Sequence, residues 1–127
     1  MANSPLHRVA IRMAMNVYGI PNCDTVKKAR KWLTDQGLEF QFIDFKKSPP
    51  TPEQIKQWVD AAGIELVLNK RGTTWRKLDD ATKAINDESL LINLMSEQPS
   101  MIKRPIIEFN GQIEVGFTPK TQSALTI

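Results

Sequence analysis

The sequence predicts an α/β protein: a four-stranded mixed sheet in the order βαβ…ββα, with a helical subdomain inserted between the two halves. A strand-turn-helix-strand pattern opens the fold at Asn16. Capped helical segments then fill roughly 51–99, and a strand pair around Asn110-Gly111 precedes a terminal helix. At 127 residues, the chain fits one domain, which we place at 16–127.

Residues 1–15 are expected to form an N-terminal extension outside the core. Arg8 and Arg12 interrupt any apolar stretch long enough for the h-region of a signal peptide, so we expect no export. Met13 and Met15 precede the first clear strand, which sets the predicted boundary after residue 15.

The first half of the sheet is predicted from a helix placed between two strands. Val26, Ala29 and Leu33 recur at helical spacing, and Gly37 ends the helix. The aromatic-rich segment 40–45 follows as a second strand. Such a βαβ unit places its strands parallel, with a right-handed crossover.

The inserted block is predicted to be helical from its capping signals. Thr51 is an N-cap residue whose capping box Gln54 completes, and this helix ends at Gly63. The stretch L-V-L-N-K-R-G-T-T-W-R-K-L is expected to form a short helix followed by a glycine-containing loop. Asp87 caps a further helix that ends before Pro99.

The second half of the sheet is predicted to be a hairpin. Two strands, Pro105–Phe109 and Gln112–Phe117, flank Asn110-Gly111, whose residues tolerate the positive φ angles of a type I′ turn. These strands should be antiparallel. Thr118 and Pro119 then open a short terminal helix.

Composition excludes several classes of protein. The 17 basic and 14 acidic residues give a net charge of +3, which does not specify a nucleic-acid partner, and no apolar run approaches the roughly 18 residues of a membrane span. One cysteine and one histidine exclude a disulfide framework and argue against a metal cluster. We therefore expect a cytoplasmic protein without metal, membrane attachment or direct nucleic-acid binding, and we expect a monomer.

The single cysteine, Cys23, is the candidate for chemistry. It lies just ahead of the first helix, where unpaired backbone N–H groups favour a thiolate, and Lys27 adds positive charge one turn on. The adjacent Asp24 would favour the neutral thiol unless its carboxylate points away. A small buried hydrophobic residue is the alternative interpretation of Cys23, and position alone leaves both open.

Three runs carry a family resemblance: Y-G-I-P-N-C-D-T-V-K-K-A-R-K-W-L, N-K-R-G-T-T-W-R-K-L and K-R-P-I-I. From about Asn16 to its end, the chain resembles the arsenate reductase and Spx-like (ArsC) family, and within it the YffB-type proteins. The resemblance implies a thioredoxin-like fold with an inserted helical subdomain. It also implies that Cys23 is the active-site cysteine, that Pro105 is a cis-proline facing it, and that Arg104 helps to bind an oxyanion or thiol substrate.

Two arginines are further candidates for substrate binding. Arg104 is chemically suitable because a guanidinium offers a fork of donors to oxyanions and carboxylates, although most such side chains are simply solvated. Arg71 belongs to a basic loop around Gly72 that has the chemistry to grip the carboxylates of glutathione. The alternative for this loop is a solvated basic face with Trp75 as a core anchor.

The chain departs from two patterns within the family. Asn69 and Gly116-Phe117 stand near places where arsenate reductases have arginines, so Arg104 alone remains of three. Because a multiply charged oxyanion requires several cations, arsenate is a less favoured substrate. Val26 stands where Spx-type regulators have a second cysteine, which excludes an intramolecular disulfide switch.

The predicted function is a glutathione-dependent thiol reductase with Cys23 as nucleophile. It binds no cofactor, acts on a small-molecule or protein thiol substrate, and relies on glutathione or a glutaredoxin to release the mixed disulfide. The alternative is a non-catalytic, Spx-like interaction or regulatory module. Arsenate reduction is the third and less favoured hypothesis.

Overall fold

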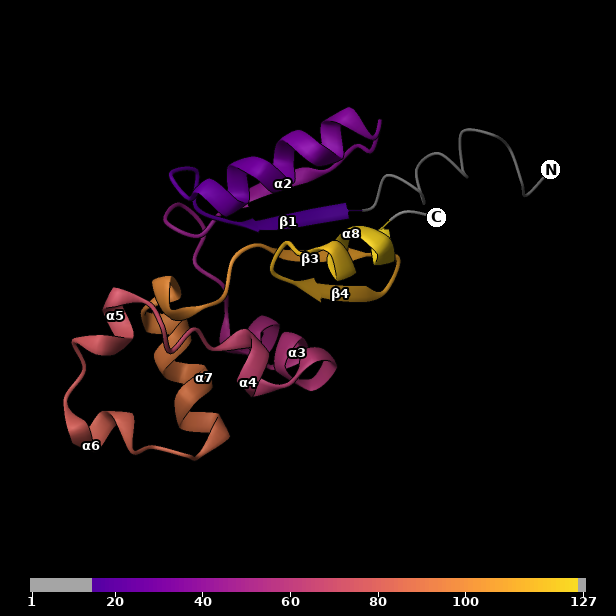
Figure 1. Ribbon diagram of the computed structural model, residues 1–127. Coiled ribbons are helices and arrows are strands. Elements are labelled where there is room, and N and C mark those ends of the chain that lie inside the picture. Colours follow the sequence, from indigo (N-terminus) through magenta and orange to yellow (C-terminus); the bar gives the residue numbers. More distant parts are fainter. Residues whose placement is uncertain (1–14, 126–127) are drawn as a thin grey trace. The chain divides into compact units, whose positions relative to one another are not determined.

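The computed structural model describes residues 15–125 (Figure 1). The predicted extension lies outside these residues except for Met15, which begins the first strand and is 1% exposed. The predicted boundary is therefore one residue late. Met15 shares the inward face of the strand with Val17, as the two-residue period of a strand requires.

The chain forms two compact units: a sheet unit of residues 15–44 and 104–125, and a helical unit of residues 45–103. The helical unit contains the whole segment predicted as the insertion, roughly 51–99. That the two units make one domain stays a prediction.

The sheet unit contains four strands and two helices. In chain order they are β1 (Met15–Gly19), α2 (Asp24–Asp35), β2 (Gln41–Asp44), β3 (Ile106–Phe109), β4 (Gln112–Val115) and α8 (Pro119–Leu125). The strand order is β2-β1-β3-β4, with β1 and β2 parallel and β3 antiparallel to both its neighbours. This confirms the predicted mixed sheet.

The core of the sheet unit joins the strands to both helices. Its buried members come from β1, α2, β3 and α8: Met15, Val17, Leu33, Ile107, Phe109 and Leu125. Val26 and Ala29 are also fully buried on α2, so the predicted apolar face of this helix is the buried one.

Local turn chemistry ends the elements where the sequence predicts it. Asn110 and Gly111 have φ angles of 50° and 77°, as the tight β3–β4 hairpin requires. Gly37 follows α2 with a φ of 74°, the left-handed conformation that ends many helices.

The helical unit contains more helices than predicted. They are α3 (Pro52–Ala62), α4 (Ile64–Val67), α5 (Thr73–Arg76), α6 (Asp80–Lys83), α7 (Glu88–Glu97) and the 3₁₀ helix η1 (Pro99–Met101). The predicted glycine-containing loop contains α5, which corrects that expectation. Helices α5 and α6 have four residues each, too few to show a helical period in the sequence.

None of the helices within residues 15–125 has the length and apolar character needed to cross a membrane.

Candidate active site

The turn between β1 and α2 positions Cys23 at the N-terminus of a three-turn helix. Cys23 is the N-cap residue of α2, with extended backbone angles (φ −95°, ψ 125°). Its N–H donates to the carbonyl of Ile20 at 3.3 Å, and its own carbonyl accepts the N–H of Lys27 at 2.9 Å. Cys23 is half-buried.

Two opposing influences set the pKa of the Cys23 thiol. Partial burial raises it, whereas the N–H of Val26, the side chain and charge of Arg104 and the N–H of Thr25 lower it. The lowering influences prevail, and the pKa lies below its ordinary value. Because a thiolate is the reactive form of cysteine, a lowered pKa is what a nucleophilic cysteine requires.

The sheet explains how Arg104 reaches a residue so distant in sequence. Antiparallel pairing of β1 with β3 sets Tyr18 opposite Ile106, which brings the residues just before β3 to the end of β1. Arg104 lies there, and the peptide bond between Arg104 and Pro105 is cis, as the family resemblance implies. The Pro105 carbonyl accepts the N–H of Gly116 at 2.8 Å. That Pro105 faces Cys23 stays a prediction.

Gly19 at the end of β1 is a site residue that the sequence did not indicate. A Cβ atom built there would lie 2.8 Å from Cγ2 of Val26, closer than packed carbon atoms tolerate. Val26 is fully buried, and its N–H is one of the groups that lower the pKa of Cys23. Because Gly19 has no side chain, the first turn of α2 can lie this close to the end of β1.

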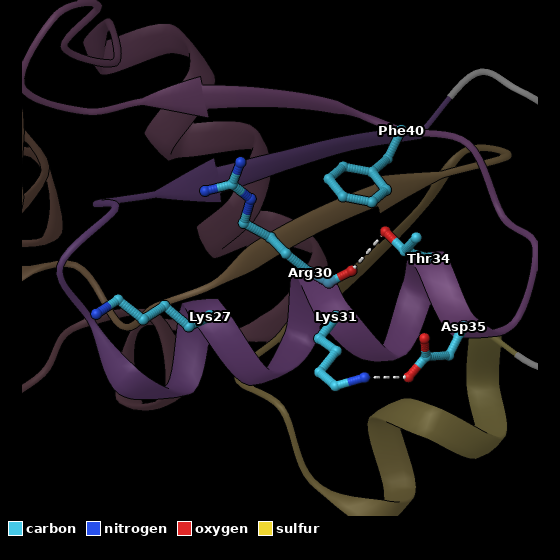
Figure 2. A pocket seen from close by; sticks show the side chains of 6 residues that line it. All are labelled: Lys27, Arg30, Lys31, Thr34, Asp35 and Phe40. Carbon is cyan, nitrogen blue, oxygen red and sulfur yellow. Dashed lines mark hydrogen bonds and ion pairs between the residues drawn. The ribbon is translucent and has the colours of Figure 1, made fainter.

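Lys27 and Arg71 occupy different surroundings. Lys27 is exposed on the first turn of α2, where it lines an open groove together with Arg30 (Figure 2). Arg71 is exposed in the helical unit, and its N–H donates to Oδ1 of Asn69 at 3.0 Å. Binding of glutathione by Arg71 stays a prediction.

The basic loop around Gly72 also contributes a buried side chain. Trp75 is 8% exposed, as the core-anchor alternative requires, and Nζ of Lys70 lies 5.4 Å from its ring centroid. Among residues 15–125, no group of three or more His, Cys, Asp or Glu side chains has the arrangement to hold a metal ion.

Residues 18–125 match the ArsC family. The chain belongs to the ArsC family. A relative of this ArsC-family protein, an uncharacterized protein from Haemophilus influenzae, is 40% identical over 110 residues, which cover 87% of this chain and 96% of that protein. The global transcriptional regulator Spx from Streptococcus mutans is 32% identical over 99 residues, covering 76% of this chain and 72% of the regulator.

The fold agrees with a solved structure of the family. The YFFB protein superposes with a TM-score of 0.85 at 45% identity, covering 90% of this chain and all of that protein. This ArsC-family chain therefore has the thioredoxin-like mixed sheet with helices that its sequence predicts.

Proposed function

We propose that this ArsC-family protein is a glutathione-dependent thiol reductase that uses Cys23 as its only nucleophile. The observation that carries the proposal is the environment of the sulfur. Two backbone N–H groups at a helix N-terminus and the Arg104 side chain lower its pKa. The single cysteine fits a reducing compartment such as the cytoplasm.

The reaction proceeds by two thiol–disulfide exchanges. The Cys23 thiolate attacks the glutathione sulfur of a mixed disulfide, so that a Cys23–glutathione disulfide forms and the substrate leaves as a thiolate. A second glutathione thiolate then attacks the glutathione sulfur on Cys23. Oxidised glutathione leaves and the Cys23 thiolate is regenerated. The net reaction converts the mixed disulfide and one glutathione thiolate into the substrate thiolate and oxidised glutathione.

Arg104 has two roles in this proposal. It donates to the Cys23 sulfur and holds positive charge beside it, so it stabilises the attacking thiolate. A guanidinium also presents its N–H donors in a planar fork that matches a substrate carboxylate. Arg71 is a further candidate for binding glutathione. A glutaredoxin is a further candidate for the partner that releases the mixed disulfide.

Arsenate remains the less favoured substrate. Asn69 stands near one of the arginine positions of arsenate reductases, and its side chain accepts the N–H of Arg71 instead of presenting a cation. A multiply charged oxyanion that binds with a single arginine would lose much of its hydration without compensation.

Similarity to Spx favours a second candidate function, a regulatory protein that binds a partner and does not turn over a substrate. In that case Cys23 would still react with glutathione under oxidation, but no second thiol would release it at a useful rate. Turnover therefore distinguishes the two functions.

The test is reduction of the mixed disulfide of glutathione and 2-mercaptoethanol, followed by the formation of oxidised glutathione. We expect turnover by the wild type, none above background with Cys23→Ser, and a loss of about ten-fold or more in kcat/KM with Arg104→Ala. Equal rates for the wild type and Cys23→Ser would overturn the proposal. A stable glutathione adduct without turnover would favour the regulatory function.

A further inference from the structure

We propose that the groove along α2 binds an acidic segment of the protein substrate whose disulfide reacts at Cys23, an inference that rests on the proposed function. The groove has a volume of about 510 Å³. Its lining comes from one exposed face of α2 and from the segment before β2: Lys27, Arg30, Lys31, Thr34, Asp35 and Phe40 (Figure 2).

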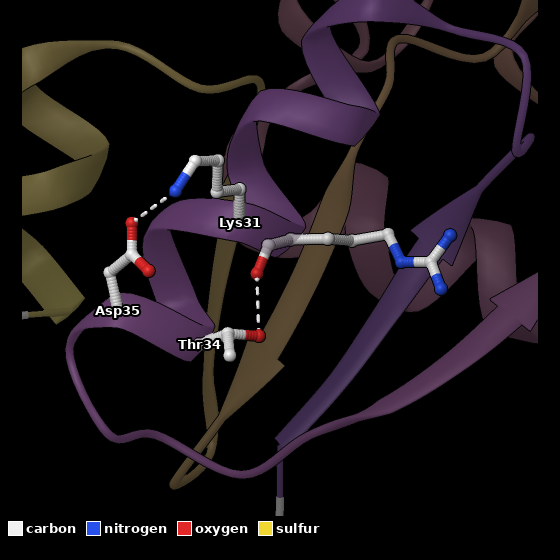
Figure 3. Close-up of polar contacts among 4 residues, drawn as sticks. Lys31, Thr34 and Asp35 are labelled. Carbon is white, nitrogen blue, oxygen red and sulfur yellow. Dashed lines mark hydrogen bonds and ion pairs between the residues drawn. The ribbon is translucent and has the colours of Figure 1, made fainter.

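Helical spacing brings the cations of the groove together. Lys27, Arg30 and Lys31 are three and four residues apart, which sets them on the same side of the helix. Lys31 forms an ion pair with Asp35 at 2.9 Å (Figure 3). Neither Lys27 nor Arg30 pairs with a carboxylate among residues 15–125. The uncompensated positive charge therefore lies toward the Cys23 end of α2.

Arg30 is held in place before any partner arrives. Its guanidinium carbon lies 4.1 Å from the ring centroid of Phe42 on β2, and the side chain is half-buried. A guanidinium stacked on a ring keeps donors at its edge and loses little conformational freedom on binding a carboxylate. The Thr34 hydroxyl donates to the Arg30 carbonyl at 3.0 Å, one turn further along the helix.

The groove and the reactive sulfur belong to the same helix. Lys27 donates its backbone N–H to Cys23, so the groove begins one turn beyond the cysteine and runs along a helix about 18 Å long. A polypeptide whose glutathione disulfide is attacked by Cys23 would thus have the residues beside its own cysteine near Lys27 and Arg30. Carboxylates at those residues would lower the free energy of the encounter complex and speed association.

Charge and extent favour an acidic peptide over a nucleic acid. Within the described part of the chain, two cations without a carboxylate partner line the groove, whereas a protein that binds DNA can make about six to ten phosphate contacts. A short glutamate- or aspartate-rich segment needs no more than these two cations and finds Phe40 as an apolar contact.

The test compares two peptide–glutathione mixed disulfides, one with glutamates beside its cysteine and one with glutamines. We expect wild-type kcat/KM to be higher for the acidic peptide, and the acidic-to-neutral ratio to fall about ten-fold with Arg30→Glu. Lys28→Glu is the matched control: Lys28 is exposed on the same helix but outside the groove, so the ratio should stay at the wild-type value.

A binding measurement separates this inference from the proposed function. Fluorescence anisotropy of the labelled acidic peptide with Cys23→Ser should show binding that Arg30→Glu weakens and Lys28→Glu does not. If the wild type turns over neither disulfide, the proposed function fails while this measurement still tests the groove. Equal binding by both charge variants, or displacement by an oligonucleotide that binds more tightly than the peptide, would overturn the inference.

Discussion

The reactivity of Cys23 depends on a few atoms supplied by neighbours. The N–H groups of Thr25 and Val26 come from the first turn of its own helix, and the Arg104 side chain comes from the start of β3. Asp24 is exposed and does not belong to the groups that shift the pKa of the thiol. The pKa of Cys23 is therefore lowered by the helix N-terminus and Arg104 without a contribution from Asp24, the opposing influence that the sequence left open.

Tyr18 and Glu108 form a second polar arrangement on neighbouring strands. The Tyr18 hydroxyl donates to Oε1 of Glu108 at 2.8 Å, and Nδ2 of Asn16 donates to the same oxygen at 3.2 Å. Burial raises the pKa of Tyr18 above its usual range. The Glu108 carboxylate raises it further, both as hydrogen-bond acceptor and as a neighbouring negative charge. Tyr18 therefore remains a protonated donor that ties β1 to β3.

Substitution of Gly19 should raise the pKa of Cys23. In Gly19→Ala the added methyl group meets Val26 at 2.8 Å and pushes the first turn of α2 away from the sulfur, so the pKa of Cys23 should rise and stability should fall by about 1–3 kcal/mol. The pH dependence of alkylation and urea unfolding measure the two effects.

A second substitution provides the control for Gly19. Val26→Ala removes the methyl groups in conflict, so the double variant should recover the low pKa of Cys23 even though it loses core volume. If the double variant is no more reactive than Gly19→Ala at neutral pH, the contact does not position the helix.

At the scale of the elements, the sequence was informative wherever a capping signal accompanied a helical period. The Thr51 hydroxyl accepts the N–H of Gln54 at 3.2 Å, and the Gln54 side chain accepts the N–H of Thr51 at 3.0 Å, which completes the predicted capping box. The Asp87 carboxylate accepts the N–H of Leu90 at 3.1 Å and caps α7 as predicted. Such caps depend on residues a few positions apart, so they can be read locally.

Removal of the cap should destabilise the helical unit. Thr51→Ala leaves the Gln54 N–H without its side-chain acceptor at the start of α3, and we expect a loss of about 1 kcal/mol in the free energy of unfolding. Urea denaturation followed by circular dichroism measures it. Ser48→Ala, in the exposed segment before α3, is the control and should change the unfolding free energy by less than about 0.5 kcal/mol.

The groove on α2 was not predicted, although its residues were visible in the sequence. The sequence indicated Lys27 only as a positive charge one turn beyond Cys23, and it did not single out Arg30 or Lys31. The missing information was the position of Phe42, because a ring on β2 orders Arg30 and no local pattern indicates which strand lies beside a helix.

At the scale of the whole molecule, the candidate site requires the completed sheet. Cys23 and its two backbone donors can be predicted from a helix N-terminus, which is local. The approach of Arg104 follows from the pairing of β1 with β3, two strands separated in sequence by the helical unit. Composition and periodicity do not reveal such a pairing, so this part of the site came from the family resemblance.

Formation of the site should make stability depend on pH. The pKa of Cys23 is lower in the folded chain than its ordinary value of 9.0, so the unfolded chain holds the proton over the interval between the two. The unfolding free energy of the wild type relative to Cys23→Ser should therefore rise as the pH increases through this interval. It should fall back as the pH drops through the folded pKa, and urea unfolding at several pH values measures the difference.

The matched variant in this series is Arg104→Ala. Loss of its hydrogen bond and charge raises the pKa of Cys23 toward the ordinary value, so the pH-dependent difference from Cys23→Ser should shrink. A difference between the wild type and Cys23→Ser that does not vary with pH would mean that folding leaves the thiol unperturbed.

The most direct measurement is the rate of alkylation of Cys23 in the folded wild type as a function of pH. Since only the thiolate reacts, the midpoint of the profile is the pKa of this single cysteine. The arrangement of the Val26 and Thr25 N–H groups and Arg104 predicts a midpoint below 9.0 that moves upward in Arg104→Ala. A midpoint at or above 9.0, unchanged by Arg104→Ala, would contradict the activation of Cys23.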